Sequence, residues 1–321
     1  MVFVGKRGWF FLVSGLLILP GVISLLIPPP LTPGIDFTSG SALEVTFVRG
    51  TDVNEDAVRD VLDDHGHSEA LIQKTGGRSV FIRTDVLEPQ VEGPEGAVSS
   101  EQAVIERDLE DRIGLIESRD FDTVSAIVAE EMVRNAIIAV LFAAVGILVY
   151  VTWAFRNIPN SFRYGVSAIL ALVHDMLLIV GIFSILGKAL NVEVNSMFIV
   201  GLLTVLGYSV NDTIVVFDRI RENVARNPDR PFPGLVNLSI METIGRSLNT
   251  SLTTLFVLLA LLLFGGSTIR PFLLVLIIGV VVGTYSSAAI ASQFLVIWER
   301  GELRRALGYL PFVRRAPARS G

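Results

Sequence analysis

The chain has 321 residues, of which 51% are hydrophobic, and its mean hydropathy is +0.60. These values exceed those of ordinary soluble enzymes and favour a membrane protein. The absence of cysteine excludes disulfides, thiol nucleophiles and thiolate metal sites, and three histidines disfavour a histidine-rich metal centre. Charge is uneven, since residues 34–134 hold 23 Asp and Glu against 9 Lys and Arg, whereas the remainder holds 9 against 17. The two parts are therefore expected to occupy different environments.

Six apolar stretches are long enough to cross a bilayer, which takes about 20 residues. They lie at about 9–28, 135–155, 163–187, 194–217, 247–266 and 270–298. The first stretch follows Lys6 and Arg7, as the apolar part of a signal peptide follows its basic residues. It is longer than such an apolar part, however, and ends in three prolines without a small-residue cleavage pattern. We therefore expect it to remain as the first of six transmembrane helices.

Positive residues in short loops predict the orientation, because Lys and Arg near span ends are retained in the cytoplasm. With six spans, the basic residues before the first span, between the second and third, between the fourth and fifth, and after the sixth fall on one side. The opposite short loops hold only Lys188 and Arg270. The sequence therefore predicts a multi-pass protein of the cell membrane with both termini in the cytoplasm and an acidic segment outside.

This acidic segment has its own pattern of strands and helices. Alternation, apolar spacing and turn residues predict a strand at 41–48, an Asp-capped helix at 52–64, strands at 69–74 and 79–84, a loop at 86–98, a helix at 100–116 and a strand at 120–127. The order βαββαβ is that of a ferredoxin-like α+β domain. We therefore expect an α-helical membrane protein with six transmembrane helices and a ferredoxin-like extracytoplasmic domain between helices 1 and 2.

The expected domain boundaries follow from these patterns. The parts are a cytoplasmic N-terminus with helix 1 (1–30), the extracytoplasmic domain (31–134), helices 2–6 with a cytoplasmic loop at about 219–246 (135–298), and a basic cytoplasmic tail (299–321). The segment 233–245 is mildly amphipathic and is expected to lie along the membrane interface.

Three ionisable residues fall in or at the ends of the apolar stretches. Asp175 lies near the middle of the third span, Asp212 lies in the fourth beside Asn211, and Arg246 begins the fifth. Ionisable side chains are costly inside a bilayer and face a bundle interior, a wet cavity or a partner. Each is therefore a candidate functional residue.

Polar residues around Asp212 and Arg246 form stripes at helical spacing. Thr204, Tyr208 and Asn211 share one face with Asp212, and Thr250, Thr253 and Thr254 follow Arg246. If the stripes face each other, a guanidinium beside the carboxylate would lower its pKa while burial would raise it, which is a basis for proton exchange. The alternatives are a purely structural ion pair and an arginine that reaches the cytoplasmic interface.

Two further patterns are present outside this group. Gly279, Gly283 and Ser287 place a small residue at every fourth position of the sixth span, which favours close helix packing, either within the chain or with another subunit. His65 and His67 lie near carboxylates, but their place at a helix end in an acidic domain favours a solvated surface over a metal site.

The run Gly207–Asn223 (GYSVNDTIVVFDRIREN) resembles the signature of the SecF family of the protein-export machinery. The run GIDFTSG, which contains Asp36, Phe37 and Gly40, is similar to the family's other hallmark, although Ser39 replaces the usual Gly. A turn that requires positive φ would be strained at Ser39. The sequences around VRNA at 133–136, His174-Asp175 and Arg246 also resemble the family pattern.

The resemblance implies a partner, SecD, with a related six-span half, in a pseudo-symmetric complex of the proton-driven resistance-nodulation-division class. It also implies work with the SecYEG channel, the SecA ATPase, a translocating preprotein and membrane lipid, without nucleic acid. By position in the matching motifs, Asp212 and Arg246 would be ion-coupling residues, with Asp175 and Asn211 as further candidates. The expected coupling ion is H⁺ or Na⁺, and no catalytic group, resident metal or other cofactor is expected.

Other functions remain open from the residues alone. A half-transporter of the same superfamily that exports lipid or a small molecule would use a similar bundle. An intramembrane aspartyl protease would need paired carboxylates, but Asp175 and Asp212 lie at different expected depths, roughly 9 Å apart along upright helices. A structural scaffold would not explain the intramembrane ionisable residues.

Overall fold

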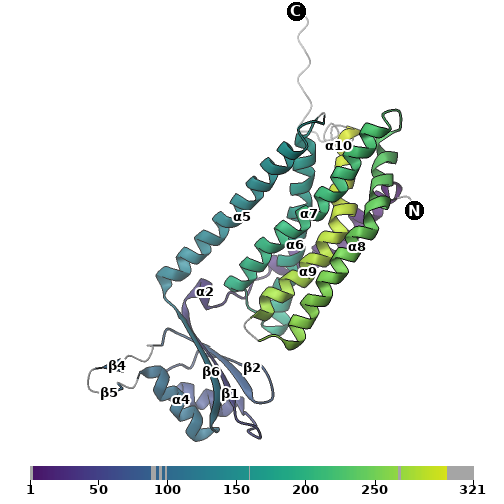
Figure 1. Ribbon diagram of the computed structural model, residues 1–321. Coiled ribbons are helices and arrows are strands. Elements are labelled where there is room, and N and C mark those ends of the chain that lie inside the picture. The colour runs from purple at the N-terminus through teal and green to yellow at the C-terminus, as the bar shows by residue number, and fades with distance from the viewer. Residues whose placement is uncertain are drawn as a thin grey trace, which may run out of the picture. The chain divides into compact units, whose positions relative to one another are not determined.

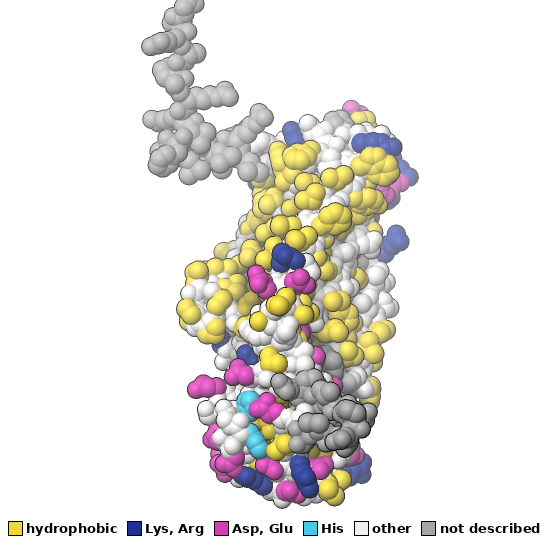
Figure 2. All heavy atoms as spheres, turned by 90° about the vertical axis from the view of Figure 1, so that its left-hand side faces the viewer, with side chains coloured by type: hydrophobic (Ala, Val, Ile, Leu, Met, Phe, Trp, Pro, Cys, Tyr) yellow, Lys and Arg dark blue, Asp and Glu magenta, His cyan; other side chains and the backbone are white. Residues whose placement is uncertain are grey.

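The computed structural model describes residues 3–87, 92–93, 96–97, 100–158, 160–266 and 269–301. The chain divides into two compact units. One contains the residues through Thr32 and those from Ile138 onward, and the other is Pro33–Ile137. Figure 2 shows apolar side chains over the helical unit and carboxylate and histidine side chains over the unit with the sheet.

The helical unit is a bundle of long helices (Figure 1). Six helical segments among the described residues are long and apolar enough to cross a membrane. They are η1 and α1 (Val4–Lys6 and Arg7–Leu26), α5 (Ala126–Ala154), α6 (Phe162–Leu190), α7 (Ser196–Arg226), α8 (Phe232–Phe264), and α9, η3 and α10 together (Arg270–Ser286, Ser287–Ala291 and Ser292–Glu299). The six predicted spans are thus present as helices.

Several helix boundaries differ from the sequence-based expectation. Residues 219–246 are helical except for the short connection 227–231, because α7 and α8 extend well beyond their most apolar parts. The segment 233–245 is the first part of the continuous helix α8, not a separate helix. Pro231 and Pro233 flank its first residue, and proline at the start of a helix costs no internal hydrogen bond.

The other unit contains a four-stranded antiparallel sheet in the order β2-β3-β1-β6. In chain order its elements are α2 (Ile35–Thr38), β1 (Gly40–Phe47), α3 (Glu55–Asp64), β2 (Leu71–Lys74), β3 (Ser79–Thr84), the hairpin of β4 (Glu92–Gly93) and β5 (Gly96–Ala97), α4 (Glu101–Arg112) and β6 (Ile116–Val124). Alternate residues of β1, namely Leu43, Val45 and Phe47, are buried with apolar residues of α3 and α4.

Local side chains and glycines determine where the helices of this unit begin and end. The cap of α3 is Asn54, whose side chain accepts a hydrogen bond from the backbone N–H of Asp56 at 3.0 Å, so the prediction of an Asp cap was wrong. Helix α4 ends at Arg112, earlier than predicted, because Gly114 has a φ of 148° and turns the chain into β6.

The turn between α2 and β1 is strained at Ser39. Its φ is 65° and its ψ is 169°, in a region that side chains with a Cβ atom rarely adopt. The next residue, Gly40, also has positive φ (125°), and a Cβ there would lie 2.6 Å from the carbonyl oxygen of Thr84. Gly40 is therefore required for the approach of two strands, whereas Ser39 adopts a conformation that suits glycine.

Replacing Ser39 with Gly is expected to increase the free energy of unfolding by about 1 kcal/mol, because it relieves the positive φ. Thermal unfolding of the purified full chain measures the effect. Ser39→Ala is the matched control, since alanine keeps the Cβ atom and should give no gain. Equal stability of the Gly and Ala variants would contradict this explanation.

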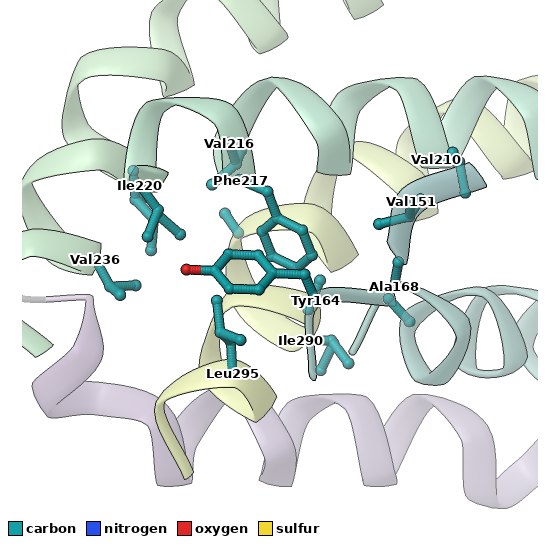
Figure 3. Close-up of a cluster of buried hydrophobic side chains, with 14 of the residues drawn as sticks. Val151, Tyr164, Ala168, Val210, Val216, Phe217, Ile220, Val236, Ile290 and Leu295 are labelled. Carbon is teal, nitrogen blue, oxygen red and sulfur yellow. The ribbon is translucent and has the colours of Figure 1, made fainter. Parts of the chain in front are cut away.

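An aromatic and aliphatic cluster packs in the interior of the helical unit (Figure 3). The ring of Phe217 in α7 lies edge-on to Tyr164 of α6, with centroids 5.3 Å apart, and Phe155 stacks on Tyr164 at 5.2 Å. Ile290 and Leu295 pack against the same cluster. Because lipid tails are as apolar as these side chains, close packing contributes more here than transfer from water.

Candidate functional site

Asp175 lies in the interior of the helical unit, on α6. Its side chain is fully buried and accepts three hydrogen bonds. Ser209 of α7 donates to Oδ2 at 2.6 Å, Ser286 of α9 donates to Oδ2 at 2.8 Å, and Nδ1 of His174 lies 2.9 Å from Oδ1. Donors from three helices therefore surround the carboxylate, which compensates for the loss of water.

His174 is also buried, beside Asp175. Its Nε2 atom has no hydrogen-bond partner among the described residues, and its ring lies 6.3 Å from that of Tyr285 on α9. An orphaned buried nitrogen is uncommon in a packed interior. His174 therefore has an unused polar atom next to the most buried carboxylate of the bundle.

Asp212 lies on α7 and is half-buried. Ser247 of α8 donates to Oδ1 at 2.5 Å, and Ser287 donates to Oδ2 at 2.8 Å. Each oxygen of the carboxylate therefore accepts one serine hydroxyl. The carboxylate of Asp212 therefore lies between three helical segments, and its side chain is less buried than that of Asp175.

The suggested ion pair between Asp212 and Arg246 is not formed in the described part of the chain. Arg246 is exposed on α8 and lines a polar pocket with Asp218, Arg219, Glu222 and Glu242. Arg219 of α7 donates to Glu242 of α8 at 2.7 Å, which links the two helices. Arg219 also pairs with Glu222 on its own helix. The neighbouring serine, Ser247, occupies the position expected for the guanidinium.

Other polar residues of the predicted stripes are exposed on the helical unit. Thr204 and Asn211 of α7, and Thr250 and Thr253 of α8, have exposed side chains, and so does Asn249, which was not part of the predicted stripes. The hydroxyls of Thr204, Thr250 and Thr253 donate to carbonyls of their own helices, three or four residues earlier. The chain therefore presents a polar face within two segments that are apolar enough to span a membrane.

The small residues of α9 allow it to approach α7 closely. A Cβ on Gly279 would lie 2.9 Å from the Cβ of Val205, and one on Gly283 would lie 3.0 Å from the Cβ of Ser209. This seam packs within the chain. The same close approach brings Ser286 and Ser287 to the two carboxylates.

The helix then changes to the π-helical segment η3 (Ser287–Ala291). The hydroxyl of Ser292 donates to the carbonyl of Ser287 at 2.9 Å, and Nε2 of Gln293 donates to the carbonyl of Ala288 at 3.2 Å. Each acceptor lies five residues before its donor. π-Helical turns are rare overall, but where they occur they often lie at functional sites. This one begins at Ser287, which donates a hydrogen bond to Asp212.

The remaining sequence candidates lie in the other unit. Asp36 is buried in the short helix α2, and Phe37 is half-buried beside it. His65 lies 2.8 Å from Asp108, and His67 lies 3.0 Å from Glu101, so these histidines pair with α4 and are less exposed than expected. No group of three or more potential metal-binding side chains occurs among the described residues.

Four serines that hold the carboxylates were not assigned this role from the sequence. They are Ser209, Ser247, Ser286 and Ser287, of which only Ser287 was singled out, as a packing residue. A usable signal was present, because adjacent serines in an apolar span require hydrogen-bond partners there. Their partners depend on helix rotation, which spacing alone does not give.

Comparison with known proteins identifies the family of this bundle. Residues 104–301 match the family model "Protein export membrane protein SecD/SecF, C-terminal". Protein translocase subunit SecF of Thermobaculum terrenum is 44% identical over 298 residues, covering 92% of this chain and 93% of that protein. The chain belongs to the SecD/SecF family.

Longer SecD/SecF relatives match over part of their length. Protein translocase subunit SecDF of Bacillus subtilis is 34% identical over 94% of this chain, which corresponds to 39% of that protein. The crystal structure of the translocon-associated membrane protein SecDF from Thermus thermophilus matches with a TM-score of 0.78 and 33% identity, over 94% of this chain and 39% of that one. SecD/SecF membership thus rests on sequence and fold together.

Proposed function

We propose that the chain is the SecF subunit of the Sec translocase and acts with SecD to promote preprotein export through SecYEG and SecA, driven by the proton-motive force. Family membership and the relatives named protein translocase subunit SecF support this function. The carboxylate of Asp212, held between α7, α8 and η3, is the observation that supports ion coupling. Transport of one charge through 100 mV supplies about 2.3 kcal/mol.

The coupling ion in this proposal is the proton. Ser247 and Ser287 each place a hydroxyl within hydrogen-bond distance of one carboxylate oxygen of Asp212, and a hydroxyl can donate to the ionised acid or accept from the protonated one. A proton binds a carboxylate oxygen without a larger ligand set. During the cycle, movement of Arg246 towards Asp212 would favour release of this proton, because a nearby guanidinium stabilises the ionised form.

SecD is the partner that covers the polar face formed by Asn211, Arg246, Asn249, Thr250 and Thr253. Exposed polar side chains are costly in hydrocarbon, and a related helical half with polar residues of its own would satisfy them. The Bacillus subtilis relative, named protein translocase subunit SecDF, supports this pairing, because its name indicates SecD and SecF in one chain.

The unit Pro33–Ile137 is the ferredoxin-like extracytoplasmic domain in this proposal, and both termini are cytoplasmic. Its order of strands and helices, β1-α3-β2-β3-α4-β6, and the sheet order β2-β3-β1-β6 support the fold. Its excess of carboxylates suits an aqueous setting, and the basic residues after Glu299 suit the cytoplasm. The domain would contact the emerging preprotein.

The test of this function is restoration of export in cells depleted of their own SecF and SecD. Co-expression of this chain with a compatible SecD should restore the rate at which a secreted precursor matures in pulse-chase labelling. Either subunit alone should not, although each is present in the membrane. Restoration by this chain without SecD would contradict the partnership, and no restoration by a folded pair would contradict the function.

A further inference from the structure

Ser286 and Ser287 are consecutive residues, yet each holds a different carboxylate. Ser286 donates to Oδ2 of Asp175 on α6, and Ser287 donates to Oδ2 of Asp212 on α7, both at 2.8 Å. Neighbouring residues of a helix point about 100° apart, so one turn at the junction of α9 and η3 can serve two flanking helices. Asp175 and Asp212 are thereby joined through a single peptide unit.

Each of these serines also has a second acceptor on its own helix. Oγ of Ser286 lies 3.3 Å from the carbonyl oxygen of Gly283, and Oγ of Ser287 lies 3.1 Å from that of Thr284. A hydroxyl has one hydrogen, so it donates to the carboxylate or to the carbonyl, and can accept with its lone pairs. Both serines therefore have a built-in alternative to the carboxylate.

We propose that Ser286 and Ser287 are positioning residues that couple the protonation of Asp175 to that of Asp212. When a carboxylate is ionised, its serine donates to it. When the carboxyl group gains a proton, the new O–H donates to the serine oxygen, and the serine hydrogen turns to the carbonyl of α9. The only bond that forms is the O–H bond of the acid, and no bond of the serine breaks.

The backbone next to this pair is suited to carry the coupling. Ser287 is the first residue of the π-helical segment η3, and its carbonyl accepts the hydroxyl of Ser292. A hydroxyl that turns towards Gly283 or Thr284 alters hydrogen bonding in the turn that leads into η3. Since adjacent peptide units share this backbone, the state of one serine changes the geometry of the other.

Other titratable groups lie on the same helices. Those considered for the two acids are His174 of α6, Tyr208 of α7, Arg246 of α8 and Tyr285 of α9. Nδ1 of His174 contacts Oδ1 of Asp175, whereas Tyr208 contacts Ser251, Tyr285 contacts Ser14 and Phe10, and Arg246 is exposed. Direct electrostatic interaction between the two acids is the competing explanation, and it does not require the serine hydroxyls.

Infrared titration of the full chain in lipid vesicles tests the coupling. The carbonyl stretch of each protonated acid is assigned by its loss in Asp175→Asn and Asp212→Asn. We expect the pH midpoint of Asp212 to differ between the wild type and Asp175→Asn, which is the cross-effect of one acid on the other. This cross-effect should be lost when either Ser286→Ala or Ser287→Ala is also present.

Two variants serve as matched controls. Ser247→Ala removes an equivalent donor to Asp212 from α8, and Ser287→Thr keeps the hydroxyl. The cross-effect should survive in both. It would overturn the coupling if the cross-effect were absent from the wild type, or if it persisted in Ser286→Ala and Ser287→Ala as direct electrostatics requires.

This inference rests on the proposed role of Asp212, but the two can fail separately. Export by the Asp212→Asn variant tests the proposed function, and the titration reads protonation in the isolated chain. Normal export by Asp212→Asn with an intact serine-dependent cross-effect would contradict the function alone. Loss of export by Asp212→Asn, together with a cross-effect that persists in Ser286→Ala and in Ser287→Ala, would contradict the coupling alone.

Discussion

Asp212→Asn is expected to reduce precursor maturation to the rate of cells that lack the chain, while the protein remains in the membrane at its normal level. Asparagine keeps the size of the side chain, and its oxygen can accept from one of Ser247 and Ser287 while its NH2 group donates to the oxygen of the other. It cannot bind and release a proton. Pulse-chase labelling of a secreted precursor, with SecD co-expressed, measures the effect.

Asp218→Asn is the matched control on the same helix. Asp218 is exposed and pairs with Arg221 at 2.5 Å, three residues further along α7. An exposed pair of this kind contributes little to stability, so export should be unchanged. If Asp212→Asn also exported at the normal rate, the carboxylate would be a packing residue. Loss of the protein itself from the membrane would indicate a structural role.

Gly279→Ala is expected to lower the free energy of unfolding by about 1–3 kcal/mol, in the range found for overpacked cores. The new Cβ would lie 2.9 Å from the Cβ of Val205 and closer still to both of its methyl groups. No rotation of Val205 relieves the contact with its own Cβ, so α7 and α9 must separate. Retention of native size after graded heating of the purified chain measures the loss.

Gly15→Ala provides the control, because a Cβ on Gly15 of α1 has no atom within 4 Å. It should leave stability unchanged or slightly higher, since alanine is the better helix former. Combining Gly279→Ala with Val205→Ala should recover part of the loss, because the two methyl groups are removed. Additive losses in the double variant would contradict the proposed close contact.

The sequence predicted the long elements of the fold well, because their signals are strong. Apolar stretches of spanning length gave all six helical segments, and alternation in 41–48 corresponds to β1. Their ends were less predictable. Helix α8 begins at Phe232, well before the apolar stretch that was predicted to span the membrane. Hydropathy does not show how far backbone hydrogen bonding extends beyond an apolar stretch.

The candidate site could be predicted only in part. Asp175 and Asp212 were singled out individually, because an ionisable side chain is costly inside a bilayer. The structure places both beside hydrogen-bond donors from other helices. Their partners were not predictable, because rotating α8 by the angle of one residue decides whether Arg246 or Ser247 faces Asp212. The π-helical segment η3 has no sequence signal comparable to hydropathy, although it determines how Ser287 meets α7.

The most direct test of proton coupling is proton flux through vesicles that contain this chain together with SecD. With an imposed pH difference, the wild-type pair should carry protons faster than empty vesicles, and Asp212→Asn should reduce the flux to that background. Asp218→Asn should carry protons at the wild-type rate. Equal flux with Asp212→Asn and the wild type, or flux of Na⁺ in place of H⁺, would contradict the account.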